Sequence, residues 1–227
     1  MSVWDFPLRL FHWALFLSVV GAIISAKAGV LWVHERFGLT VLGLIIFRIA
    51  WGFVGGHYSQ FRQFLAMPRM ALQELQTLFK ATPKPESQSN IEAKFGHSAL
   101  GGYAVLFLLG IPFFMAVSGT MSNDDVLFDG PLAHLVPNFT DKATSAHHFG
   151  EKLLFSILLL HVGAILFYKY KKKRNLTNVM VTGNVDAMPA SAADGSISAK
   201  HSYFGLFLML VFIAAAQSIT LLRPVLF

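Results

Sequence analysis

Five long apolar segments constrain the fold of this chain more than any other feature of its sequence. Each holds about 20 residues with few charges, which is enough for a helix to cross a hydrocarbon core about 30 Å thick. Charged residues make up 13% of the chain, against about 25% in a typical soluble domain. One soluble core cannot hold several such segments, so the pattern predicts an all-α integral membrane protein. The predicted spans are residues 6–26, 31–54, 98–118, 147–170 and 203–222.

The positions of Lys and Arg predict how these spans are oriented. Basic residues are concentrated after the second and fourth spans: Arg62, Arg69, Lys80, Lys84, Lys94, Lys171, Lys172, Lys173 and Arg174. The opposite loops hold Lys27 and Lys142 with four acidic residues, Asp124, Asp125, Asp129 and Asp141. Because positive loops stay in the cytoplasm, we expect a multi-pass membrane protein with a cytoplasmic N-terminus.

The predicted spans and the connections between them divide the chain into three parts. Residues 1–174 are expected to form a four-helix transmembrane bundle, and residues 201–227 a fifth, C-terminal transmembrane helix. Residues 175–200 are rich in Ala, Ser, Gly and Asn, which predicts an irregular cytoplasmic connection. Residues 61–79 mix Phe and Leu with Arg, Gln and Glu, which predicts an amphipathic helix on the membrane surface, broken near Pro68.

Cysteine content and net charge exclude several classes of function. The chain has no cysteine, which excludes disulfides, iron–sulfur clusters held by thiolates and covalently attached c-type haem. Its net charge of +6 is concentrated in a few loops, as membrane topology requires, so it does not indicate nucleic-acid binding.

Four histidines lie in the spans at depths that match in pairs. Metal-binding or ionisable side chains are costly in a bilayer and usually functional. His12 and His161 are expected near the cytoplasmic face, and His34 and His147 near the outer face. His147 and His161 are fourteen residues apart, about 40° short of four helical turns, so they leave one side of the helix with a rise of about 21 Å. Two such imidazole pairs are the ligand sets of two six-coordinate b-type haems, which suit electron transfer.

These histidines have other possible roles. For a single histidine, a hydrogen-bonded residue facing the membrane interface is the alternative. A zinc site fails for the four together because the pairs lie about 20 Å apart by helix rise. His148 points about 140° away from His161 around the helix, so His147 is preferred as the ligand and His148 is left as its neighbour.

Several other residues are weaker candidates for the same sites. Gly38, one turn after His34, would let a flat macrocycle approach the backbone, although close packing of membrane helices through small residues explains it equally well. Arg9, Arg36 and Arg48 are candidates to pair with haem propionates. Arg9 serves equally as a topology-setting charge, and Arg36 is more readily explained as an interfacial residue.

His97 opens the third span on the cytoplasmic side. Three roles are open to it: it replaces His12 as a haem ligand, it lines a quinone pocket, or it caps the start of the helix.

The histidine-bearing segments resemble the bacterial cytochrome b561 family, which includes the cytochrome b subunits of nickel–iron hydrogenases and formate dehydrogenases. The resemblance covers about residues 3–183. It is carried by VWDFPLRLFHW, VHERFG, FRIAWGFVGGHY, GHSALGG, SAHHFGEKLL and LLLHVGAILFY. The fifth span departs from the four-helix hydrogenase and formate dehydrogenase subunits.

The resemblance implies a protein of the bacterial cytoplasmic (inner) membrane that holds two non-covalent haems b. His12 and His161 would bind the inner haem, and His34 and His147 the outer one. It further implies electron exchange between the quinone pool and a redox partner outside the membrane, with a quinone contact near His97 and Ser98. That partner would be a periplasmic c-type cytochrome or an enzyme's electron-transfer subunit. The acidic outer loop is a candidate docking surface for it, and a solvated loop made acidic by membrane topology is the alternative.

Two other functions are alternatives to electron transfer, and one of them would make the chain itself an enzyme. A superoxide oxidase that reduces quinone would need a cationic funnel at the outer surface, and the acidic loop argues against one. A transporter or assembly anchor without redox chemistry is the other alternative, and the matched histidines argue against it.

Overall fold

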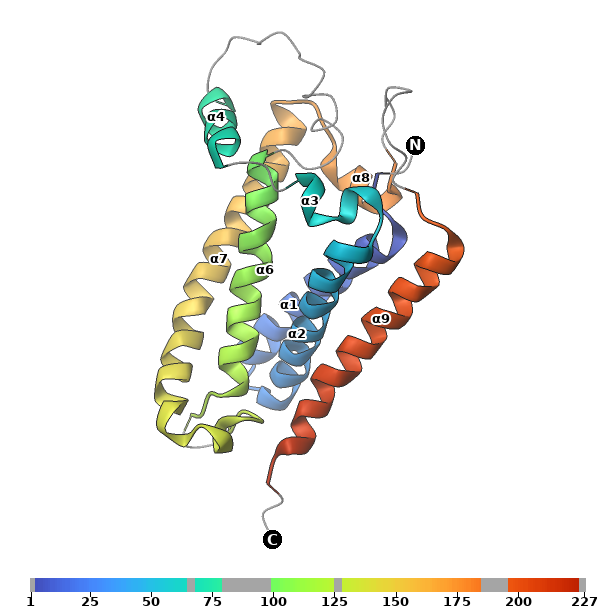
Figure 1. The fold of residues 1–227 in the computed structure, drawn as a ribbon. Helices are drawn as coiled ribbons and strands as arrows, with labels where there is room; N and C mark the ends of the chain where they lie inside the picture. The colour runs from blue at the N-terminus through green and yellow to red at the C-terminus, as the bar shows by residue number, and fades with distance from the viewer. Residues whose placement is uncertain (1–2, 65–67, 79–98, 125–127, 185–195, 225–227) are drawn as a thin grey trace. The chain divides into compact units, whose positions relative to one another are not determined.

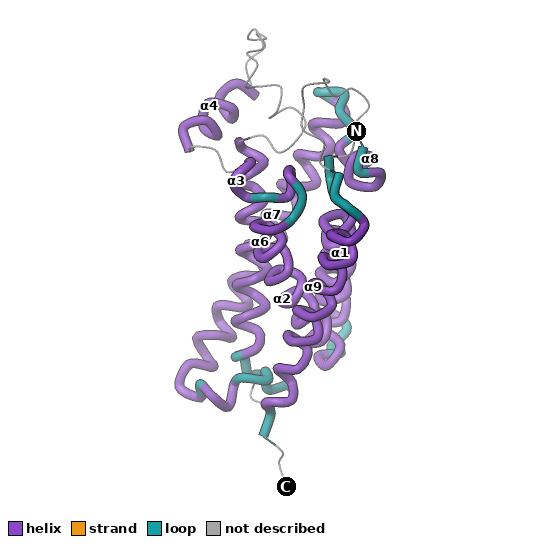
Figure 2. The backbone as a smooth tube through the Cα atoms, turned by 45° about the vertical axis from the view of Figure 1, so that its right-hand side comes forward, coloured by secondary structure: helices purple, strands orange, loops and turns teal. Residues whose placement is uncertain are grey.

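The computed structural model describes residues 3–64, 68–78, 99–124, 128–184 and 196–224. Within these ranges the chain is helical and forms no strand (Figure 2). The helices long and apolar enough to cross a membrane are α1 (Phe6–Lys27), α2 (Leu31–Val54), α6 (Ala99–Thr120), α7 (Thr140–Tyr170) and α9 (Ala199–Ser218), shown in chain order by colour in Figure 1. The prediction of an all-α membrane protein with five spans is confirmed.

Two of the long helices begin earlier than the sequence predicts. α7 begins at Thr140 instead of His147, and α9 begins at Ala199 instead of Tyr203. An apolar segment indicates which residues lie in the hydrocarbon core. The helix itself can extend into the polar region, as long as its backbone hydrogen bonds are made. Asp141 in the first turn of α7 favours this earlier start, because a carboxylate stabilises a helix N-terminus. His147 therefore lies well inside α7.

The prediction of an irregular connection over residues 175–200 is wrong for Leu176–Thr182, which form the short helix α8. The side chain of Asn175 accepts a hydrogen bond from the backbone N–H of Asn178, 3.2 Å away, and so caps the helix start. Gly183 ends the helix in the left-handed conformation, with φ of 80°, and its N–H donates to Val179 O. Local capping thus forms a helix that apolar periodicity does not signal.

The remaining described helices are short. In its described residues, the segment predicted as an amphipathic helix forms α3 (Phe61–Phe64) and α4 (Pro68–Leu78). The predicted break falls on residues 65–67, which lie outside the described residues. The other short elements are the 3-10 helices η1 (His57–Ser59), η2 (Ala133–Leu135), η3 (Pro137–Phe139) and η4 (Ile219–Leu222).

The chain divides into two compact units. One comprises Met1–Arg9, Ala50–Phe107 and His161–Gly205, and we name it the Asp5 unit after its buried carboxylate. The other comprises Leu10–Ile49, Leu108–Leu160 and Leu206–Phe227, and we name it the His34 unit.

A buried carboxylate, that of Asp5, organises the Asp5 unit. It caps α1 by accepting a hydrogen bond from Leu8 N at 2.9 Å. It also accepts from Trp51 Nε1 at 3.2 Å, from Gly56 N at 3.1 Å and from Ser59 Oγ at 2.6 Å. These bonds join the start of α1 to the end of α2 and to η1.

In the His34 unit, α9 packs against α2 at very short range. A Cβ placed on Gly43 would lie 2.6 Å from Ile213 Cα, so the two helices approach backbone to backbone and leave no room for a side chain. Further along, Gln217 Nε2 donates to Arg36 O at 2.8 Å and to Thr40 Oγ1 at 3.0 Å. Small residues and amide hydrogen bonds are common means of joining helices inside membranes.

Candidate functional site

Two histidines face each other in the His34 unit. His34 on α2 and His147 on α7 have ring centroids 5.9 Å apart, with the ring planes at 84°. His34 Nδ1 lies 2.9 Å from the carbonyl oxygen of Ala22 on α1, and His147 Nδ1 lies 2.9 Å from that of Met115 on α6. A carbonyl can only accept, so each ring is assigned a proton on Nδ1, which leaves the lone pair of Nε2 free for a metal.

A cavity of about 380 Å³ adjoins the two rings. This volume falls within the range of about 300–1,000 Å³ that small-molecule and cofactor sites occupy. Its apolar lining includes Val19, Ala22, Ile23, Pro112, Met115 and Leu154. Its polar lining includes Lys27, Glu35, Asn123, Asp124, His148 and Glu151. An apolar pocket with a few polar groups suits a large, flat organic cofactor.

Gly38 and Gly150, which lie near the histidines, have different surroundings. A Cβ on Gly38, which lines the cavity, would meet no atom within 4 Å, so the absence of a side chain there keeps the cavity open. A Cβ on Gly150 would lie 2.6 Å from Met115 Cγ, so this glycine allows α7 to pack closely against α6. For Gly38, open space beside the backbone fits the approach of a macrocycle better than close helix packing does.

The donor set fits a haem iron. Two neutral imidazoles with free Nε2 lone pairs would hold such an iron, because histidine nitrogen is a common ligand of haem iron. Within the described residues no group of three or more His, Asp or Glu side chains is arranged to hold a metal ion. The two imidazoles and the adjoining apolar cavity therefore fit a haem better than a tetrahedral metal ion.

His148 differs from His147 in its surroundings. Its side chain is exposed and its ring centroid lies 6.3 Å from that of His147, whereas His147 is half-buried and is anchored to Met115. These contacts favour His147 over His148 as the residue that faces His34. Iron ligation by either one stays a prediction.

Comparison with known proteins identifies the family. Residues 3–183 match the prokaryotic cytochrome b561 family. The chain belongs to this family. It is therefore a multi-pass bacterial membrane protein that binds haem b and transfers electrons across the membrane. No curated protein and no solved structure matches the chain.

The second predicted haem site of this cytochrome b561 has His12 and His161 as its expected ligands. His12 lies on α1 in the His34 unit, is half-buried and packs edge-on against Trp13 with centroids 5.2 Å apart. His161 lies on α7 in the Asp5 unit and is also half-buried. α7 is one continuous helix over both His147 and His161, as their fourteen-residue spacing assumes. The pairing of His12 with His161 stays a prediction, and His97 and Ser98 lie outside the described residues.

The arginines predicted to bind propionates differ in their surroundings. Arg9 Nη1 donates to Val181 O of α8 at 2.6 Å. Arg36 is exposed, and its Nη1 donates to Gln217 Oε1 at 3.1 Å and to Thr220 Oγ1 at 3.4 Å. Arg48 is 2% exposed on α2. Arg9 thus joins α1 to α8, and Arg36 joins α2 to the α9 region. The roles of these arginines toward haem propionates stay predictions.

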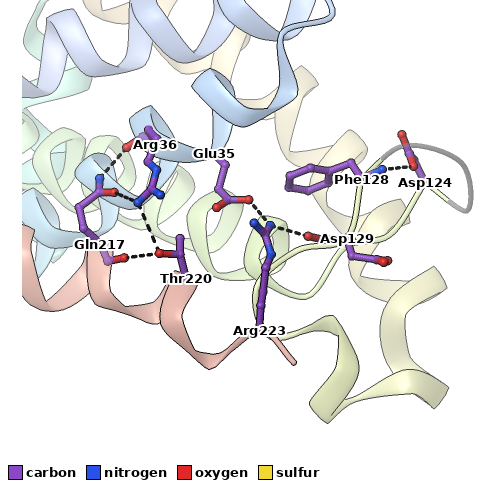
Figure 3. Close-up of polar contacts among 8 residues, drawn as sticks. All are labelled: Glu35, Arg36, Asp124, Phe128, Asp129, Gln217, Thr220 and Arg223. Atoms are coloured by element: carbon purple, nitrogen blue, oxygen red, sulfur yellow. Dashed lines mark hydrogen bonds and ion pairs between the residues drawn. The ribbon is translucent and has the colours of Figure 1, made fainter. Parts of the chain in front are cut away.

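Two charged pairs beside the cavity were missed by the sequence analysis. Lys27 Nζ and Glu151 Oε1 form an ion pair at 2.7 Å. Glu35, which follows His34, is buried and pairs with Arg223 (Figure 3). An acidic residue inside a predicted span was the available signal for Glu35, because such residues are rare and usually functional.

Proposed function

We propose that this cytochrome b561 carries electrons across the membrane through two haems b, each held between two histidines. His34 and His147 would hold one haem, and His12 and His161 the other. One observation carries the proposal: His34 and His147 face each other beside an apolar cavity, each with its Nδ1 anchored to a backbone carbonyl.

The chain's own residues perform three tasks in this proposal. The carbonyls of Ala22 and Met115 fix the orientation of both rings and increase their basicity as ligands, because they accept the Nδ1 protons. Gly38 keeps the cavity open for the macrocycle, and the apolar lining excludes water. When bound, a haem with two histidine ligands supplies reversible one-electron oxidation and reduction.

We further propose the two ends of the electron path. The quinone pool exchanges electrons at the cytoplasmic end, near His97 and Ser98, and the N-terminus lies on that side. A periplasmic c-type cytochrome or an enzyme's electron-transfer subunit docks at the outer end. The support is the basic character of the predicted cytoplasmic loops and the exposure of Asp124, Asp129 and Asp141 in the opposite segments.

Four single substitutions test the ligand assignment: His34→Ala, His147→Ala, His148→Ala and His161→Ala. The unmodified protein should bind two extractable haems per chain. The first two variants should each lose the same haem, and His161→Ala should lose the other. His148→Ala is the matched control, because it removes an imidazole adjacent to His147 and should keep both haems. Haem-to-protein ratios and low-temperature electron paramagnetic resonance (EPR) spectra of the purified chain measure these outcomes.

Two results would overturn this assignment. If His147→Ala keeps both haems and His148→Ala loses one, His148 is the iron ligand and His147 is its neighbour. A folded but colourless protein would favour a transporter or anchor over a cytochrome. Stopped-flow reduction by a short-chain quinol should be faster than reduction by superoxide; the opposite order would favour the superoxide oxidase alternative.

A further inference from the structure

A guanidinium from the C-terminal region reaches the wall of the cavity. Arg223 follows η4 and lies beyond residues 3–183, the part that matches the family. Its Nη2 donates to Glu35 Oε2 and to Asp129 O, the latter at 2.6 Å (Figure 3). Its Cζ also lies 5.9 Å from the ring centroid of Phe128. One side chain thus contacts α2 and the segment between α6 and α7.

These contacts lie next to the proposed haem site. Glu35 is 8% exposed, follows His34 directly and lines the same cavity. Phe128 also lines that cavity. Asp129 pairs with Asn123, another lining residue, in an isolated bridge. Arg223 therefore connects two parts of the cavity wall, one of which carries a proposed ligand.

The carboxylate of Glu35 makes this contact electrostatically important. A buried carboxylate without a partner is strongly unfavourable, and its charge acts over longer distances in a low-dielectric region than in water. Arg223 supplies the opposite charge to Glu35 and satisfies Asp129 O with the same planar group. Both hydrogen bonds are donated by the same nitrogen, Nη2.

We propose that Arg223 is a positioning residue for the cofactor between His34 and His147. It balances the charge of Glu35 beside His34 and holds the two parts of the cavity wall together. This inference rests on the proposed function. It adds a residue outside the family-matched region that adjusts the redox potential of one particular haem.

The charge balance gives each substitution a definite sign. Arg223→Gln leaves the carboxylate of Glu35 unbalanced, which favours the more positive, oxidised iron and lowers the reduction potential. Glu35→Gln leaves the guanidinium unbalanced and raises the potential. The double variant removes both charges and should return close to the unmodified value. Each single shift should correspond to a change of about tenfold or less in the reduction equilibrium, and tenfold is about 59 mV for one electron.

The test is a spectroelectrochemical titration of the full-length haem-loaded protein. Repeating it in a His161→Ala background leaves only the haem in question, so its potential can be assigned. Gln217→Leu is the matched control: it removes the amide bonds between α9 and α2 without changing any charge, and should leave the potential unchanged. If Arg223→Gln does not accumulate, Glu35→Gln and the double variant complete the test, because neither leaves a buried carboxylate without a partner.

The outcomes separate this inference from the proposed function. Opposite shifts for the two single variants, cancelled in the double variant, support the role of Arg223. Equal potentials for Glu35→Gln and the double variant, or an equally large shift in Gln217→Leu, overturn it. A wild-type protein without bound haem, or without the EPR signature of two axial histidines, overturns the proposed function instead.

Discussion

Asp5 and Glu35 are both buried carboxylates, 3% and 8% exposed, but their surroundings differ. Asp5 accepts hydrogen bonds from two backbone N–H groups and two side chains of its own unit, and it is not among the residues that line the cavity. Glu35 pairs with the guanidinium of Arg223, lines the cavity and lies next to His34 in the sequence.

This difference separates residues that hold the fold from residues that serve the cofactor. A carboxylate surrounded by several neutral donors is satisfied by local structure, and its removal leaves all of those donors without an acceptor. A carboxylate balanced by one guanidinium keeps a charge whose effect depends on that partner. Changes around Asp5 should therefore alter unfolding, whereas changes around the cavity should alter the haem.

The largest effect on stability is expected from Asp5→Ala. The substitution removes an N-cap, worth about 1 kcal/mol, and leaves buried donors unsatisfied at about 1–3 kcal/mol each. We expect the free energy of unfolding to fall by roughly 3 kcal/mol or more. Thermal or denaturant unfolding of the detergent-solubilised protein, followed by tryptophan fluorescence, measures this change.

Asp141→Ala is the control for Asp5→Ala. Asp141 is an exposed acid in the first turn of α7, so its loss should cost less than about 1 kcal/mol. Equal destabilisation by the two variants would contradict the comparison. So would an Asp5→Ala protein of unchanged stability that has lost the haem between His34 and His147.

A smaller effect on stability, but a large one on the cofactor, is expected from Gly38→Leu. A side chain here enters open cavity space, so it should displace the macrocycle without straining the apoprotein. We expect the haem-to-protein ratio to fall from two to one, and the spectrum of the other haem to persist. Gly110→Leu is the matched control, because its Cβ also meets no atom within 4 Å but Gly110 does not line this cavity. Two haems in Gly38→Leu would show that the cavity is not the haem site.

The sequence predicted the five spans because membrane thickness fixes the length of an apolar helix. It predicted the helix ends less well, because ends depend on capping and local hydrogen bonds. Asn175 and Gly183 form α8 inside a segment expected to be irregular, and Asp141 supports an earlier start for α7. Each of these residues is visible in the sequence, but its effect depends on the residues next to it and not on apolar periodicity.

The histidines of the candidate site could be predicted from the sequence, but the groups that contact the site could not. His34 and His147 stood out because imidazoles inside spans are rare and their depths match. The carbonyl groups that anchor them have no sequence signature, since every residue carries one. Arg223 lies 188 residues from Glu35, and nothing local in either segment indicates their contact. Tertiary packing supplies this information.

The finest test of the cavity is Gly119→Ala, which acts on one ligand ring without removing it. A Cβ on Gly119 would lie 3.1 Å from His147 Cε1 and 3.2 Å from its Nδ1, which is closer than ordinary contact. The ring should shift by a few tenths of an ångström and weaken its bond to Met115 O. We expect both haems to remain bound, with a changed EPR spectrum for the haem between His34 and His147. Gly110→Ala on the same helix meets no atom within 4 Å and should leave that spectrum unchanged, so a similar change in both variants would show that the His147 ring does not respond to its contact with Gly119.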